Sequence, residues 1–168
     1  LGAILLCGGL FSCSSEVIQQ ANYEIIPLPQ EIKISTGNFV LNDRTSIVYP
    51  KGNDEMQQNA NLLATYIRQM SGKKLKVIDE QITSNVITLT TGLNTDNAEA
   101  YQLKVTPDNI IIRGASEAGT FYGIQTLRKS LPATNKGDIS LPGVEINDYP
   151  RFSYRGVHLD VSRHFFPI

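Results

Sequence analysis

The chain has 168 residues, and with 41% of them hydrophobic it can bury the core of one ordinary domain. Its 15 basic and 16 acidic side chains leave a formal net charge of −1. That balance excludes a strong positive field, so we expect no nucleic-acid partner and no direct attraction to an acidic membrane surface.

The start of the chain has the composition of an export signal. Residues 1–11 are almost wholly apolar, and the run is too short to span a bilayer. The sequence Leu10-Phe11-Ser12-Cys13 that ends this run resembles a bacterial lipobox, in which Cys13 carries the lipid. Phe11 departs from the small residue usual at its position, and the alternatives are a simple signal peptide cleaved nearby or a short buried segment.

We therefore expect a signal or lipoprotein leader over residues 1–13 and a polar tether over residues 14–22. The expected protein is a bacterial one, exported to the periplasm, the outer membrane or the cell surface. It would contact the membrane only through a lipid anchor.

Metal and cofactor chemistry has little support in the sequence. The two cysteines, Cys7 and Cys13, both lie in the leader, which excludes disulfides and thiolate metal sites from the folded part. His158 and His164 are six residues apart across the end of a predicted strand, so they do not share a helix face as a zinc pair would. The segment 114–119 has neither phosphate-loop nor dinucleotide-loop spacing and is predicted to be a strand-to-helix turn. We expect no metal and no cofactor.

The first structural segments after the tether are predicted to be extended. Residues 23–34 contain two prolines, which restrict them to a sheet edge or a bend. Short strands over 38–41 and 46–49 are separated by the turn residues Asn42-Asp43, which predicts a β-meander. Asn53 then caps a helix of about 16 residues whose apolar positions recur at helical spacing, and Gly72 closes it.

Strands and a second helix follow. Strands are predicted over residues 75–79, 86–90, 100–105 and 109–113, and Asp108-Asn109 predicts a hairpin for the last pair. Ser116 caps a helix over 117–130 that Pro132 stops. Strands outnumber helices and the helices are single. We therefore expect an α+β domain over residues 23–147, with a mostly antiparallel sheet and two helices packed on one face.

The last 21 residues, 148–168, change in character, because they carry three arginines, two histidines and two aspartates. Phe152 to Val161 is predicted to be a strand. Period-two alternation places Arg155 on one face and His158 and Asp160 on the other, and neither face is plainly solvent or core. Such a strand usually needs a neighbour on each side, as in a parallel barrel with charged groups at one end.

Tyr154-Arg-Gly-Val-His-Leu-Asp-Val-Ser-Arg-His-Phe165, preceded by Asp148-Tyr-Pro-Arg-Phe152, resembles the opening strand of the catalytic barrel in glycoside hydrolase family 20, the β-N-acetylhexosaminidases. Residues 99–105 and 119–128 resemble the accessory domain that precedes that barrel. The resemblance implies that residues 148–168 begin a (β/α)8 barrel, truncated here. It also implies an exo-acting hydrolase whose partners are glycans with terminal N-acetylglucosamine or N-acetylgalactosamine.

The resemblance also implies a substrate-assisted, retaining mechanism. The acetamido oxygen of the sugar attacks the anomeric carbon, a glutamic acid protonates the leaving oxygen, and the preceding aspartate orients the acetamido group. Family 20 carries this Asp-Glu pair on a later barrel strand. Asp54-Glu55 fits helix N-terminal electrostatics, and Asp79-Glu80 lies where a strand runs into a turn. Neither follows the histidine and glycines of the family, so we expect no catalytic acid in this chain and no activity from it alone.

Arg155 matches the family arginine that holds sugar hydroxyls, a task that suits the fixed fork of guanidinium donors. The residues alone leave the alternative that Arg155 is a structural ion-pair partner. Asp160, Arg163 and His164 lie at the end of the predicted strand and are supporting candidates for substrate binding. Their alternative is that Asp160 and Arg163 pair to hold the first loop.

Two functions from different classes remain open. The first is the front part of an exported β-N-acetylhexosaminidase. The second is a non-enzymatic exported module that binds glycan or a partner protein through its sheet, with residues 155–164 as an ordinary C-terminal strand.

Overall fold

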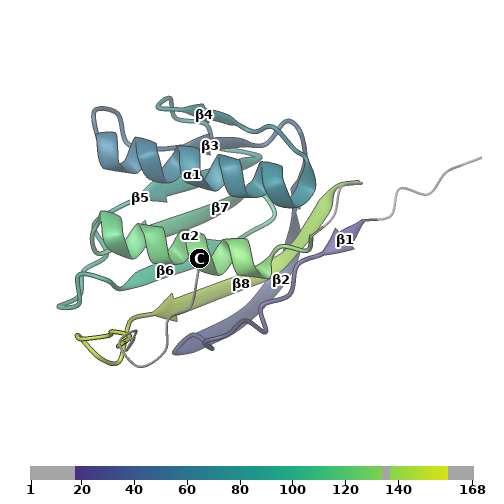
Figure 1. The fold of residues 1–168 in the computed structure, drawn as a ribbon. Coiled ribbons are helices and arrows are strands. Elements are labelled where there is room, and N and C mark those ends of the chain that lie inside the picture. Colours follow the sequence, from purple (N-terminus) through teal and green to yellow (C-terminus); the bar gives the residue numbers. More distant parts are fainter. Residues whose placement is uncertain (1–17, 134–136, 159–168) are drawn as a thin grey trace, which may run out of the picture.

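The computed structural model describes residues 18–133 and 137–158 (Figure 1). The predicted leader, including Cys13, lies outside the described residues, as does the tether apart from its last residues. Asp160, Arg163 and His164 lie outside them as well. None of the helices within the described ranges is long and apolar enough to cross a membrane.

Two helices and one mixed sheet make up the described part of the chain. The helices are α1 and α2, and the strands are β1 to β8. In chain order the elements are β1 Gln19–Gln20, β2 Glu31–Leu41, β3 Ser46–Val48, α1 Asp54–Ser71, β4 Lys76–Ile78, β5 Val86–Thr90, β6 Tyr101–Val105, β7 Asn109–Gly114, α2 Glu117–Ser130 and β8 Ile139–Asp148. The sheet order is β1-β8-β6-β7-β5-β3-β4, and β2 also pairs with β8.

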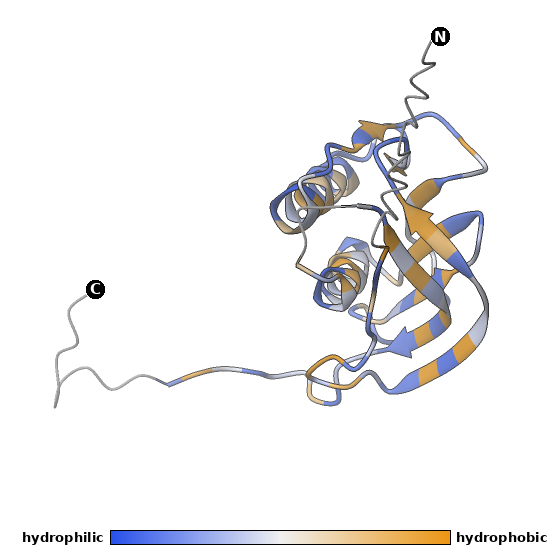
Figure 2. Cartoon of the chain, turned by 90° about the vertical axis from the view of Figure 1, so that its right-hand side faces the viewer, coloured by the Kyte–Doolittle hydropathy of each residue, from blue (hydrophilic) through white to orange (hydrophobic). Residues whose placement is uncertain are grey.

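Both helices begin and end at the residues whose chemistry predicts it. The side chain of Asn53 accepts a hydrogen bond from the Met56 N–H at the start of α1, and Gly72 ends the helix in the left-handed conformation. The side chain of Ser116 accepts one from the Gly119 N–H at the start of α2. The two helices contact each other and cover the same face of the sheet, as predicted (Figure 2).

The prediction of a mostly antiparallel sheet is not confirmed. Four of the seven strand pairings within the described residues are parallel: β1 with β8, β3 with β4, β3 with β5, and β5 with β7. For β3 and β4 the physical reason is that α1 is a crossover connection. It carries the chain back to the end of the sheet where β3 began, so β4 runs parallel to β3. The predicted hairpin is confirmed, because β6 and β7 pair antiparallel.

The predicted β-meander is wrong. β2 pairs with β8, whereas β3 pairs with β4 and β5, so the two segments do not pair with each other. β8 itself was not predicted, although it is the strand with which β2 pairs and it also pairs with β1 and β6 (Figure 1). Pro142 lies in its middle, opposite the register shift between Ile34 and Asn38 of β2, a place where a sheet tolerates proline.

The core lies between the sheet and the two helices. Its largest fully buried side chains come from both layers: Phe39, Leu41, Ile47, Met56, Leu63, Ile67, Ile87, Leu89, Leu103, Ile110, Ile112 and Ile124. Three small or polar positions of α2, Gly119, Thr120 and Gly123, are also buried, and Gly123 lies against Ile112 of β7. Because this interface is closely packed, the distance between α2 and the sheet is fixed, and with it the position of the helix side chains that do not face the sheet.

The opening barrel strand is not confirmed within the described residues. Phe152 to His158 form no strand and are exposed, and the remainder of the predicted strand lies outside the described part. A strand needs hydrogen-bond partners along an edge, and none of the described strands pairs with this segment. The segment instead leaves the end of β8 and passes beside α2.

Candidate functional site

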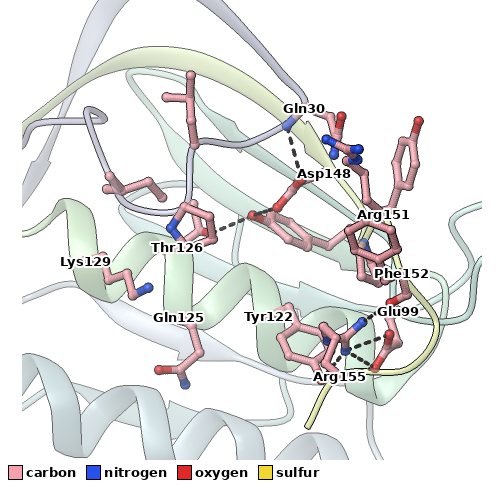
Figure 3. Close-up of a pocket in the computed structure, with 16 residues that line it drawn as sticks. Gln30, Glu99, Tyr122, Gln125, Thr126, Lys129, Asp148, Arg151, Phe152 and Arg155 are labelled. Carbon is pink, nitrogen blue, oxygen red and sulfur yellow. Dashed lines mark hydrogen bonds and ion pairs between the residues drawn. The ribbon is translucent and has the colours of Figure 1, made fainter. Parts of the chain in front are cut away.

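A cavity of about 590 Å³ lies where the chain leaves β8. Its walls are the outward face of α2, the loop before β2 and the exit segment, which we define as residues 149–155 (Figure 3). The apolar lining is contributed mainly by the loop and the exit segment: Ile25, Pro27, Leu28, Tyr149, Pro150 and Phe152. Leu28 is 69% exposed and Phe152 is 64% exposed, so much of this lining faces solvent.

Arg155 is the predicted site residue that the structure describes, and it is held at one end of this cavity. Its Nη2 donates to both carboxylate oxygens of Glu99 at 2.9 Å, and its Nη1 donates to the Phe152 carbonyl oxygen at 2.8 Å. The hydrogen bond to Glu99 raises the pKa of Arg155. The guanidinium carbon also lies 6.0 Å from the ring centroid of Tyr122. The ion pair with Glu99 is what the structural alternative for Arg155 predicts. The contact of Arg155 with sugar hydroxyls stays a prediction.

Glu99 is itself fixed in place by its own domain. The Tyr122 hydroxyl donates to its Oε1 at 3.1 Å, and its backbone N–H donates to the side chain of Asn97 at 3.0 Å. The turn that carries Glu99 is docked on the start of α2, because the Ser116 hydroxyl donates to the Ala98 carbonyl at 2.6 Å. The hydrogen bond between Tyr122 and Glu99 thus joins the turn before β6 to α2.

Asp148 fixes the opposite end of the exit segment, at the last residue of β8. Its Oδ1 accepts the Gln30 backbone N–H at 3.1 Å, and its Oδ2 accepts the Tyr101 hydroxyl at 3.1 Å. The Tyr101 hydroxyl also bonds to Thr126 on α2, and burial raises the pKa of this phenol. The loop before β2 is tied to α2 by Lys129, whose Nζ donates to the Ile26 carbonyl at 2.8 Å.

The arrangement positions a segment rather than supplying reactive groups. Among the described lining residues the carboxylates are Glu99, which accepts hydrogen bonds from Tyr122 and Arg155, and Asp148, which accepts them from Gln30 and Tyr101. The rejected pairs agree with their local interpretation: Asp54 and Glu55 lie in the first turn of α1, and residues 79–80 directly follow β4. The half-exposed guanidinium of Arg155 is one of the lining groups that can donate to a neutral polar ligand.

Sequence reasoning missed Glu99 and Tyr122 as partners of Arg155. They are 56 and 33 residues away along the chain, and no local spacing joins them. A weak signal was present, because both lie in the two segments that resemble the accessory domain of family 20. Cys13, Asp160, Arg163 and His164 lie outside the described residues, and their assignments stay predictions.

Comparison with known proteins decides the family. Residues 22–149 match the sequence profile of "Glycosyl hydrolase family 20, domain 2". The chain belongs to glycoside hydrolase family 20. This family 20 chain is 35% identical to a β-hexosaminidase of Porphyromonas gingivalis. The alignment is 184 positions long and covers 99% of the chain and 23% of that relative.

Other relatives and solved structures agree. The chain is 30% identical to a β-N-acetylhexosaminidase of Cellulomonas fimi, covering 86% of this chain and 29% of that one. It superimposes on the family 20 β-N-acetylhexosaminidase of Streptomyces coelicolor with a TM-score of 0.75 at 29% identity, covering 84% of this chain and 29% of that one. The chain therefore spans about a quarter of the length of these two curated relatives.

Proposed function

We propose that this chain is the N-terminal part of an exported β-N-acetylhexosaminidase. The full-length enzyme would remove terminal N-acetylglucosamine or N-acetylgalactosamine from glycans. The observation that carries the proposal is the match of residues 22–149 to a domain of family 20, together with the alignment of nearly the whole chain to a β-hexosaminidase. The resemblance of residues 148–168 to the opening of the catalytic barrel supports the placing of this domain before it.

The proposed mechanism is substrate-assisted and retaining. The carbonyl oxygen of the sugar acetamido group attacks the anomeric carbon while the bond to the leaving oxygen breaks. A glutamic acid gives its proton to that oxygen, and the neighbouring aspartate orients the acetamido group. This Asp-Glu pair would lie on the barrel, beyond this chain. Arg155 would donate hydrogen bonds to sugar hydroxyls, a role that its half-exposed side chain permits.

The activity test uses the full-length enzyme with two aryl glycosides, one of N-acetylglucosamine and one of glucose. Because the acetamido oxygen is the nucleophile, we expect turnover of the first and none of the second. Chain 1–168 by itself should release no product from either. Equal rates on the two glycosides would contradict the mechanism. A full-length protein inactive on the N-acetylglucosaminide and, when the assay is repeated with it, on the aryl N-acetylgalactosaminide would contradict the function.

The proposed location is tested at Cys13. A protein with a lipidated Cys13 should fractionate with membranes, and Cys13→Ser should appear in the soluble exported fraction with its activity unchanged. Metabolic labelling with a radioactive fatty acid gives the second readout, since the label should be lost with the thiol. A wild-type protein that is exported without label would identify a simple signal peptide instead.

The open face of the sheet gives the binding-module alternative little support. Six of the polar side chains on β2, β6 and β8 already pair with one another. Gln102 donates to Glu145 at 3.3 Å and to Asn147 at 3.0 Å. Asn147 donates to Glu31, which also pairs with Lys33. Lys104 pairs with Glu145. None of these paired side chains is aromatic, so they offer no flat apolar surface on which a sugar ring could stack.

A further inference from the structure

We propose that Glu99 of the accessory domain is a positioning residue for the hydrolase reaction. It would hold the Arg155 guanidinium in the orientation in which that group binds sugar hydroxyls. The inference rests on the proposed function, and it adds a residue from outside the barrel to the machinery that binds the sugar.

The contacts of Arg155 define the orientation of its guanidinium plane. Nη2 is directed at Glu99 and Nη1 at the Phe152 carbonyl, so two hydrogen-bond directions fix the rotation of the group. Within the described residues Nε makes no hydrogen bond, and 44% of the side chain is exposed. Donors therefore remain on the open side of the group, where a pair of sugar hydroxyls could accept from them.

Charge gives the second argument. A sugar is neutral, so covering a guanidinium with a sugar removes water from a cation without supplying a counter-charge. A carboxylate already in contact with the cation reduces that penalty, because the pair is desolvated together. Glu99 satisfies this requirement, with both of its oxygens 2.9 Å from Nη2.

Rigidity gives the third argument. A free arginine side chain loses rotamer entropy when it is ordered, and prior ordering removes this cost from the binding step. Glu99 can provide the ordering because it is held by Tyr122 and Asn97 on a turn docked against α2. A loop carboxylate without those contacts would move with its ligand.

The experiment is a double-mutant cycle in the full-length enzyme: wild type, Glu99→Gln, Arg155→Ala and the double variant. We expect Glu99→Gln to lower kcat/KM for an aryl N-acetylglucosaminide by about tenfold, with KM raised. In the Arg155→Ala background the same change should have no further effect. Glu145→Gln is the matched control, because Glu145 also pairs with a cation, Lys104, but on the opposite face of the sheet.

Each outcome decides the matter. A purely structural role for Glu99 would reduce the amount of active enzyme, which lowers kcat without raising KM and adds to the loss in the Arg155→Ala background. That result, or wild-type kinetics for Glu99→Gln, would overturn the role of Glu99 while the proposed function stands. Calorimetric titration with N-acetylglucosamine gives a readout independent of turnover, and Glu99→Gln should weaken its binding. A wild-type enzyme that neither hydrolyses nor binds would overturn the proposed function and this inference together.

Discussion

Gly123 of α2 lies so close to Ile112 of β7 that a Cβ atom on residue 123 would overlap the Cγ2 of Ile112 and come within 3.1 Å of the Tyr101 ring. Alanine is the better helix former by about 1 kcal/mol, but overpacking a core costs about 1–3 kcal/mol. We therefore expect Gly123→Ala to lower the free energy of unfolding, measured by urea denaturation. Gln58→Ala, at an exposed position of α1, is the control and should change it by less than about 0.5 kcal/mol. A more stable Gly123→Ala would show that α2 can move away from the sheet.

Lys73 is 7% exposed, and its ammonium lies 2.9 Å from Asp138 Oδ1. Asp138→Asn leaves the buried cation without its counter-charge, which should cost about 1–3 kcal/mol, less than for a pair buried on both sides because Asp138 is 34% exposed. Lys73→Met removes the cation and keeps the apolar stem, so we expect a smaller loss. Thermal and urea unfolding of both variants test this order. Lys104→Met breaks the more exposed pair with Glu145 and should have almost no effect.

The buried phenols make stability depend on alkaline pH. Burial raises the pKa of Tyr101 and of Tyr23 above the ordinary value of 10.0, so the folded state retains protons that the unfolded state has lost. The stabilisation is complete below pH 10 and is lost above it, with a slope of about 1.4 kcal/mol per pH unit for each tyrosine. Urea unfolding between about pH 9 and pH 11 should therefore show a flatter decline for Tyr101→Phe. Tyr154→Phe, where the side chain is 87% exposed, should leave the wild-type slope unchanged.

If Arg155 binds sugar hydroxyls as proposed, Arg155→Ala in the full-length protein should lower kcat/KM by about 10² or more, since hydrogen bonds from a charged donor would be lost in the transition state. The melting temperature should change little, because the contacts of Arg155 are on the surface. Arg113→Ala removes an exposed arginine from β7 and is the matched control for the loss of a positive charge. An unchanged rate would leave Arg155 with its ion pair to Glu99 as its whole role.

The parts of the fold that could be predicted are those whose chemistry is local. Asn53, Gly72 and Ser116 specify helix ends through bonds to residues three or four positions away, and the β6–β7 hairpin follows from its turn. Strand order could not be read in this way. Whether β3 lies beside β2 or beside β5 depends on packing between distant segments, which hydrophobic alternation alone does not encode.

The candidate site shows the same division. Arg155 could be singled out because the residues around it resemble a known motif. Its partner Glu99 could not, because the ion pair requires the turn before β6 to be docked on α2. Strand β8 was missed for a different reason: Pro142-Gly143 has the composition of a loop, and only the register shift in β2 opposite makes room for it in a sheet.

The cavity beside the exit segment has a practical consequence for handling this domain. Ile26, Leu28, Phe152 and Tyr154 present their side chains to water at 87%, 69%, 64% and 87% exposure. At high concentration, copies of the domain would associate through these exposed apolar side chains and form soluble aggregates before any loss of fold. Replacing Ile26 and Leu28 with charged residues would keep a purified sample monodisperse without disturbing the core.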